Sequence, residues 1–389
     1  ILTDSGGMKV SKRANVAPFY AMEILKSANE LAEGGADVMH METGEPVSGA
    51  PSKVMAAALA ALDGDHLGYT EAQGLPSLRA RIARHYADIY GHDVPAEQIS
   101  VTMGASGGLI LAFLAAFDAG DRVALAEPSY PAYRNTLSAL DLEVVGLSAG
   151  PETRFQPTVE LLKGLDKPIQ GLIIASPSNP TGTMIPRAQF EAVTAYCEAE
   201  GIRIISDEIY HGITYGEPAQ SILAYTSNAI IANGFSKYFA MTGWRLGWMV
   251  LPLDLVRPVE RLAQNLFVSP SALSQVAALA AFDCRDELDA NVARYAENRK
   301  ILQGALPRAG FGDLAPCDGA FYVYADVSRL TNDSLDFCQK MLKATGVAAT
   351  PGIDFDTARG NRYVRFSFAT DRATVQGAAD ALVGWLKKD

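Results

Sequence analysis

Residues 234–247 read GFSKYFAMTGWRLG, and this stretch decides the fold of the chain. Apolar runs at residues 229–232 and 248–251 flank it, which is typical of two buried strands joined by an exposed turn. The turn holds Lys237, and Arg245 follows eight positions later. A lysine amine that is partly deprotonated can form a Schiff base with an aldehyde, and an arginine can hold an anion attached to that aldehyde. The pair therefore predicts a site for a small aldehyde that carries an anionic group.

Pyridoxal 5'-phosphate (PLP) carries both an aldehyde and a phosphate. The stretch resembles the lysine-attachment motif of class I aminotransferases, which are fold-type-I PLP enzymes of the aspartate aminotransferase superfamily. The positions of that motif are met by Gly234, Ser236, Lys237, Ala240, Met241, Gly243, Arg245 and Gly247. By this resemblance Lys237 forms the internal aldimine with PLP, and Ser236 and Arg245 bind the phosphate. The alternative interpretation is an exposed lysine and arginine beside a tight turn.

One position departs from some members of that family. They carry a phosphate-binding serine three positions before the lysine, where this chain has Gly234. The resemblance therefore assigns more of the phosphate contact to Ser236, Arg245 and a glycine-rich turn described below.

The composition is that of a globular enzyme with more than one domain. The chain has 389 residues, of which 49% are hydrophobic and 20% are charged. Its net charge of −11 comes from 33 basic and 44 acidic residues. That balance argues against a surface that binds nucleic acid or an anionic membrane.

The cysteines and apolar runs bear on the compartment. The four cysteines are widely spaced, with no C-x-x-C pair, which indicates reduced thiols in a cytoplasmic protein and no zinc or other metal site. They are Cys197, Cys284, Cys317 and Cys338. The longest apolar run, residues 109–117, is too short to span a membrane, and no signal peptide is visible. We expect Met8 to be the natural first residue, and residues 1–7 to be a remnant of an expression tag.

Short apolar segments alternate with helical or loop segments through the middle of the chain. Seven are strand candidates: residues 99–103, 122–126, 143–147, 170–175, 202–206, 229–232 and 247–251. This alternation predicts an α/β domain with a seven-stranded, mostly parallel sheet. The expected architecture is the fold-type-I PLP transferase, with a large PLP-binding domain over residues 46–280. Residues 8–45 and 281–389 are expected to form a smaller α+β domain.

A glycine-rich turn at residues 104–108 follows the first predicted strand and opens the helical run 109–117. Free backbone N–H groups and the positive end of a helix suit a phosphate. By resemblance, the Ala105 and Ser106 amides and the Ser106 hydroxyl hold the PLP phosphate. The alternatives are a bare strand-to-helix turn or half of a nucleotide site, although the G-x-G-x-x-G spacing of a dinucleotide site is missing.

Four more candidates follow strands, where ligands bind in parallel sheets. By resemblance, Tyr130 stacks on the pyridine ring, and Asn179 bonds the phenolic oxygen of PLP and the substrate carboxylate. Asp207 keeps the pyridine nitrogen protonated, and Tyr210 bonds the phenolic oxygen. The alternatives are a core tyrosine at Tyr130, a plain turn at Asn179, and a helix cap at Asp207.

The remaining candidates lie near the two ends of the chain. By resemblance, the Gly44 backbone approaches the substrate carboxylate, and Tyr69 reaches across a homodimer to the partner subunit's PLP phosphate. Residues 362–369 alternate as a strand, and the family places an arginine at Arg365 to clamp the substrate α-carboxylate. The alternatives are a strand-to-loop turn at Gly44, a surface aromatic at Tyr69 and a solvated Arg365. A long helix is expected over residues 283–306 and another over 334–345.

These features predict a PLP-dependent aminotransferase with ping-pong kinetics. Its substrates would be an L-amino acid and a 2-oxo acid, and their side chains are not readable from the sequence. Three alternatives remain open: a PLP-dependent C–S β-lyase on the same fold, a nucleotide-dependent oxidoreductase, and a non-catalytic PLP-binding regulator.

Overall fold

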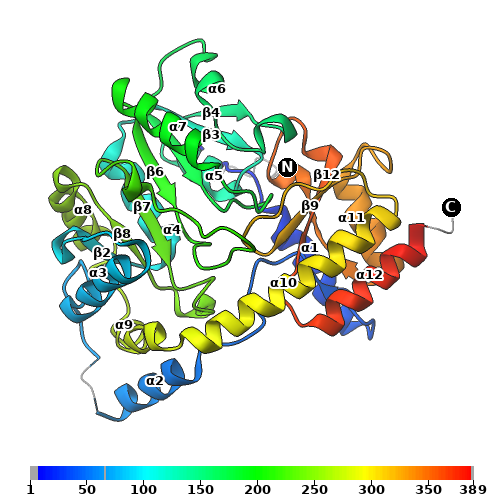
Figure 1. Ribbon diagram of the computed structural model, residues 1–389, viewed down its shortest axis with the longest axis horizontal. Helices are drawn as coiled ribbons and strands as arrows, with labels where there is room; N and C mark the ends of the chain where they lie inside the picture. Colours follow the sequence, from blue (N-terminus) through cyan, green and yellow to red (C-terminus); the bar gives the residue numbers. More distant parts are fainter. Residues whose placement is uncertain (1–7, 65–66, 387–389) are drawn as a thin grey trace.

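The computed structural model describes residues 8–64 and 67–386, and a seven-stranded sheet forms the centre of its large domain (Figure 1). The strand order is β2-β8-β7-β6-β5-β3-β4. The strands are β2 Ile99–Thr102, β3 Arg122–Glu127, β4 Glu143–Ser148, β5 Gly171–Ala175, β6 Arg203–Asp207, β7 Ile230–Gly234 and β8 Gly247–Val250. All neighbours are parallel except β8, which runs antiparallel to both β2 and β7. The predicted seven-stranded, mostly parallel sheet is confirmed, with strand ends within one or two residues of those expected.

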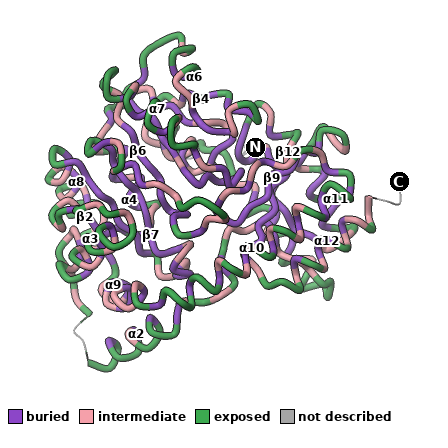
Figure 2. Tube along the Cα trace, viewed as in Figure 1, coloured by how far each residue is buried: buried purple, intermediate pink, exposed green. Residues whose placement is uncertain are grey.

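The central strands are apolar on both faces because both faces are covered. Side chains of successive strand residues point to opposite faces. Accordingly Leu172 and Ile174 of β5 belong to one hydrophobic core, whereas Ile173 between them belongs to another. Figure 2 shows the strands β6 and β7 as largely buried, with β7 buried throughout and β6 buried after its first residue. Continuous apolar runs in the sequence therefore mark this sheet, as expected for parallel strands with both faces covered.

Helices cover the two faces of the sheet, and one of them begins directly beside a strand of the site. The helices of this part are α2 Ser52–Gly64, α3 Pro76–Tyr90, α4 Gly104–Ala116, α5 Pro131–Ala139, α6 Val159–Lys163, α7 Arg187–Ala199, α8 Leu253–Leu266 and α9 Ala272–Leu279. Helix α4 packs on β7 and β8, and α8 packs on α4. Gly247 begins β8, and a Cβ atom on it would lie 2.7 Å from the Ala105 nitrogen. The start of α4 therefore rests directly against the start of β8.

The small α+β domain lies to the right in Figure 1. Its antiparallel sheet has the order β11-β12-β9, and β1 pairs with β10. The strands are β1 Met39–His40, β9 Tyr322–Asp326, β10 Val347–Ala348, β11 Thr350–Pro351 and β12 Tyr363–Ser367, and the helices are α1 Tyr20–Glu33, α10 Arg285–Arg308, α11 Ser334–Thr345 and α12 Arg372–Leu386. The long helix α10 runs from beside α9 into this domain (Figure 1).

The predicted helices of this region are present. Helix α11 covers the expected residues 334–345, and α10 is offset by two residues from the expected 283–306. The division of the chain at residues 45/46 and 280/281 stays a prediction, and residues 1–7 lie outside the described part. Across residues 8–64 and 67–386, no helix has the length and hydropathy needed to cross a membrane.

Candidate active site

The structure brings nearly all of the predicted site residues to one place. A cavity of about 210 Å³ opens where β3, β5, β6 and β7 end, against the small domain. The predicted residues that line it are Gly44, Ala105, Ser106, Tyr130, Asn179, Asp207, Tyr210, Ser236, Lys237, Arg245 and Arg365. The exception is Tyr69, whose side chain lies outside the cavity and is 87% exposed. Because carboxyl ends of parallel strands meet at one edge of a sheet, residues far apart in sequence converge here.

Lys237 follows β7 and projects its amine into the cavity. The amine donates a hydrogen bond to the Gly44 carbonyl oxygen, 2.6 Å away. Burial lowers the pKa of Lys237 to about 8, and the positive charges of Arg365 and Arg245 act in the same direction. An amine with this pKa is neutral in an appreciable fraction of molecules near neutral pH, whereas an exposed lysine is almost fully charged.

The lowered pKa gives a testable pH dependence in protein freed of cofactor. Only the neutral amine attacks an aldehyde, so the rate at which Lys237 reacts with added PLP should be half-maximal near pH 8. Below that pH the rate should fall about tenfold per unit, because protonation removes the neutral form. Stopped-flow absorbance against pH measures this rate, and the Lys237→Ala variant reports the reaction of all other amines. A midpoint near the pKa of a free lysine would contradict the assignment.

The start of α4 and Arg245, which also line the cavity, suit an anion. Helix α4 begins at Gly104 with φ +68°, and its N-cap residue, Met103, makes no side-chain cap. Its first N–H groups are therefore available to a ligand. The Arg245 Nη2 atom lies 3.0 Å from the position of a Cβ atom on Gly104. Among residues 8–64 and 67–386, no Asp or Glu carboxylate forms an ion pair with Arg245.

Asp207, the last residue of β6, is a buried carboxylate that lines the cavity. It accepts hydrogen bonds from the Tyr133 hydroxyl at 2.5 Å and the Ile209 backbone N–H at 3.0 Å. Burial raises the pKa of Asp207, while these two bonds and the charge of Lys237 oppose that rise. A carboxylate enclosed in this way strongly favours a cationic partner in the same cavity.

Tyr133 was missed in the sequence although it lies in the same segment as Tyr130. Both belong to the turn and first helical residues of α5, and the two rings meet edge to face with centroids 5.4 Å apart. The signal available in the sequence was the spacing of three residues between Tyr130 and Tyr133 at the start of a helix, because this spacing brings two side chains to the same side of the helix. Tyr133 therefore positions Asp207, and both tyrosines line the cavity.

Glu208, which follows Asp207, does not line the cavity and has partners elsewhere. Its buried carboxylate accepts hydrogen bonds from the Ser221 hydroxyl at 3.0 Å and the Ile222 backbone N–H at 2.9 Å. Burial raises the pKa of Glu208 to about 8. Glu208 thus anchors the loop after β6, and Asp207 beside it points into the site.

Arg365 is a buried cation, which contradicts the alternative of a solvated strand arginine. Its side chain is 2% exposed, on the small-domain strand β12. Nη1 donates to the Asn179 Oδ1 atom at 2.9 Å, and Nη2 donates to the Thr350 hydroxyl at 3.0 Å. The guanidinium lies 4.4 Å from the ring centre of Tyr322. Its Nε has no hydrogen-bond partner among the described residues. The charge is therefore held in place and lacks a carboxylate, as expected of a group that binds one from a ligand.

These groups fit PLP. The cavity offers an enclosed amine for an aldehyde, an uncapped helix start with Arg245 for a phosphate, and a buried carboxylate for a pyridinium nitrogen. Each of the three lies on a different strand end, so one ligand that carries all three complements can contact them together.

Comparisons with known proteins give the same class. The family described as aminotransferase class I and II matches residues 36–382. The chain is 50% identical to a valine–pyruvate aminotransferase of Mycobacterium tuberculosis over 382 residues, which are 97% of this chain and 98% of that protein. The chain therefore belongs to the class I and II aminotransferases, a family that is generally PLP-dependent, and it is a transaminase of fold type I.

Solved structures support this assignment. The crystal structure of an aminotransferase from Mycobacterium tuberculosis has a TM-score of 0.96 and 49% identity, and covers 98% of this chain and 100% of that chain. Aspartate aminotransferase from Thermus thermophilus with maleate has a TM-score of 0.91 and 29% identity, and covers 97% of this chain and 100% of that chain. The alternatives of a nucleotide-dependent oxidoreductase and a non-catalytic regulator are thereby set aside.

Proposed function

We propose that this aminotransferase binds PLP through Lys237 and transfers an amino group from an L-amino acid to a 2-oxo acid by a ping-pong mechanism. The observation that carries the proposal is the enclosed Lys237 amine, with its lowered pKa, in one cavity with Asp207 and Arg365. PLP supplies an aldehyde for the substrate amine and an electron-withdrawing ring that weakens the bond from Cα to hydrogen.

The other roles in the reaction are assigned to side chains of the protein. Lys237, once free, takes the Cα proton and returns it as a general acid, which its pKa near neutrality favours. Arg365, held by Asn179, binds the substrate carboxylate and so orients the Cα–H bond toward Lys237. Asp207 would stabilise positive charge on the ring nitrogen of PLP, and Tyr210 would bond its phenolic oxygen. Ala105, Ser106, Ser236 and Arg245 would hold its phosphate.

We further propose that the amino acid is small and neutral, with pyruvate as an acceptor. Among residues 8–64 and 67–386, the cations that line the cavity are Lys237, Arg245 and Arg365, and each already has a proposed role. The wall also includes Phe19, Ala21 and Met22 around the start of α1, which suit an aliphatic side chain. The relative named valine–pyruvate aminotransferase supports the same substrate class.

This specificity predicts a large preference for valine over aspartate as amino donor. A second carboxylate that enters the cavity without a cation loses hydration worth roughly 2 kcal/mol, which is about a 30-fold effect. We expect kcat/KM with pyruvate to be at least about 30-fold higher for valine than for aspartate. Alanine production, measured with each donor at several concentrations, tests this. Equal values would show that a cation for the second carboxylate comes from elsewhere in the assembly.

The mechanism itself is tested by absorbance and product analysis. The purified protein with PLP should change its visible absorbance when one amino acid is added, and release one 2-oxo acid per site without an acceptor. Release of pyruvate with a thiol and ammonia from a cysteine conjugate, turnover after turnover, would instead support the C–S β-lyase.

The proposal includes a homodimer and a cytoplasmic location. Tyr69 is exposed in the single chain and would reach the partner subunit's PLP phosphate. The four cysteines are free and buried, which supports a reducing compartment. The homodimer and the role of Tyr69 are tested by measuring the molecular mass of the Tyr69→Phe variant by sedimentation and its affinity for PLP. A dimer with unchanged affinity would remove Tyr69 from the phosphate site.

A further inference from the structure

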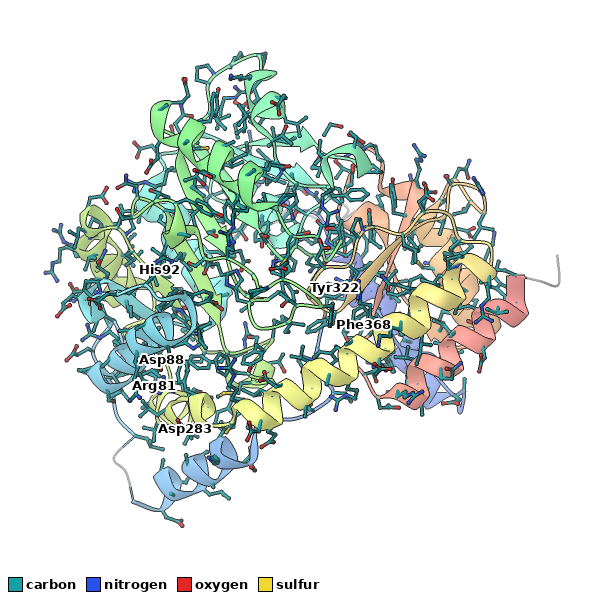
Figure 3. The ribbon with its side chains drawn as sticks, in the orientation of Figure 1. Arg81, Asp88, His92, Asp283, Tyr322 and Phe368 are labelled. Carbon is teal, nitrogen blue, oxygen red and sulfur yellow. The ribbon has the colours of Figure 1, made fainter. Side chains whose placement is uncertain are left out.

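Tyr322 was not singled out in the sequence, yet it touches three residues of the site. It is the first residue of β9, is 1% exposed, and lines the cavity. Figure 3 shows it where the loops of the large domain meet the small domain. Its three partners come from separate parts of the chain, so its position links elements that are otherwise distant.

The hydroxyl of Tyr322 makes two of these contacts. It is hydrogen-bonded to the Tyr210 hydroxyl, with the oxygens 2.7 Å apart. It also rests on Gly44, because a Cβ atom on Gly44 would lie only 1.9 Å from it. The Gly44 carbonyl is in turn the acceptor for the Lys237 amine. One hydroxyl therefore fixes both Tyr210 and the backbone that holds the amine of Lys237.

The ring of Tyr322 makes the third contact. The guanidinium carbon of Arg365 lies 4.4 Å from the ring centre, within the range of a cation–π interaction. Ser367, on the same strand as Arg365, pairs with Tyr322 in the β9–β12 ladder, so the backbone register fixes this arrangement. The ring and the hydroxyl thus act on different site residues.

We propose that Tyr322 is a positioning residue that sets the substrate carboxylate clamp at a fixed place relative to the Lys237 amine. The ring holds Arg365, and the hydroxyl holds Tyr210 and Gly44. This inference rests on the proposed function, because it gives Arg365 and Lys237 their roles in amino transfer. A misplacement between the two would turn the Cα–H bond away from the amine and slow proton transfer.

Two substitutions separate the ring from the hydroxyl. Tyr322→Phe keeps the ring on Arg365, so KM for the amino acid should stay within about twofold while kcat falls about tenfold, as expected for the loss of one buried hydrogen bond. Tyr322→Leu removes both contacts, so KM should also rise about tenfold. Isovalerate is valine without the amino group, so its binding reports on the carboxylate site at Arg365. In the PLP-loaded protein its binding should weaken only in Tyr322→Leu, the variant that loses the ring on Arg365. The pH midpoint of the visible absorbance of bound PLP should shift in both variants, because both lose the hydrogen bond to Tyr210, which is proposed to bond the phenolic oxygen of PLP.

Tyr324 provides the matched control. It lies two residues along the same strand, is fully buried, and its hydroxyl has no hydrogen-bond partner among the described residues. Tyr324→Phe should leave kcat, KM and the absorbance midpoint unchanged. A loss in Tyr324→Phe equal to that in Tyr322→Phe would show a general structural effect and overturn the positioning role.

The contact itself is tested by stability, without turnover. Gly44→Ala should lower the melting temperature of the cofactor-free protein because of the clash with the Tyr322 hydroxyl, and adding Tyr322→Phe should restore part of it. Additive effects, or normal kcat and midpoint in Tyr322→Phe, would overturn the proposal about Tyr322 alone. Absence of amino transfer in the unmodified protein would instead overturn the proposed function on which it rests.

Discussion

Replacing Lys237 by alanine should abolish nearly all amino transfer. The amine is enclosed in the cavity, has a pKa of about 8, and is held by the Gly44 carbonyl. It is the group we assign to proton transfer at Cα, and general acid–base catalysis contributes about 10²–10⁴-fold to rate. We therefore expect kcat to fall by about 10³-fold or more. Steady-state assays with valine and pyruvate measure this.

The control for this variant is Lys300→Ala. Lys300 is an exposed lysine paired with Glu297 on α10, so its loss should leave kcat unchanged. Lys237→Ala should also fail to shift the absorbance of added PLP, while its far-ultraviolet circular dichroism stays native. Full activity in a folded Lys237→Ala protein would remove the basis of the proposed mechanism.

The central sheet could be predicted because its signal is local. Strands covered on both faces appear as continuous apolar runs, and polar or glycine-rich turns separate them. The same pattern placed Asp207 and Asn179 at strand ends, since Asp207 ends β6 and Asn179 follows β5, while their roles came from the resemblance to the aminotransferase family. The strand ends alone could not have identified Gly44 and Arg365, which line the cavity from outside the central sheet and were found by the resemblance.

The contacts between the site residues could not be predicted in this way. The hydrogen bonds of Arg365 to Asn179 and of Tyr322 to Tyr210 join residues 186 and 112 positions apart. Such pairs depend on how the small domain packs against the large one, and no local periodicity reports that packing. The burial of Arg365 is an example, because strand alternation predicts which face it is on and leaves open whether that face is covered.

The lowered pKa of Lys237 depends on the same packing. Burial is its main cause, and the charge of Arg365 from the other domain adds to it. A substrate carboxylate bound to Arg365 would cancel that charge and raise the proton affinity of the amine. Arg365 and Lys237 are therefore electrostatically coupled. A substrate that lacks the carboxylate should be a poor amino donor because Arg365 does not orient it and because the proton affinity of Lys237 stays low.

Replacing Arg365 by lysine should cost about 10²-fold in kcat/KM for the amino acid. Lysine keeps the positive charge and loses the planar two-point fork that matches a carboxylate. It also loses the bonds to Asn179 and Thr350, which hold the guanidinium in place. Truncating one partner of a buried, hydrogen-bonded charge pair costs roughly 2–5 kcal/mol, and the retained charge places this variant near the lower end.

Arg362→Lys is the matched control for that prediction. Arg362 precedes β12, its side chain is 57% exposed, and its nearest acid, Asp326, lies 3.6 Å away, so kcat/KM should not change. Affinity for PLP should remain normal in both variants, because the hydrogen bonds of Arg365 go to Asn179, Glu42 and Thr350 and to none of the residues assigned to the phosphate. A normal kcat/KM in Arg365→Lys would show that charge alone binds the carboxylate. Weakened PLP binding with unchanged amino acid affinity would move Arg365 from the substrate site to the cofactor site.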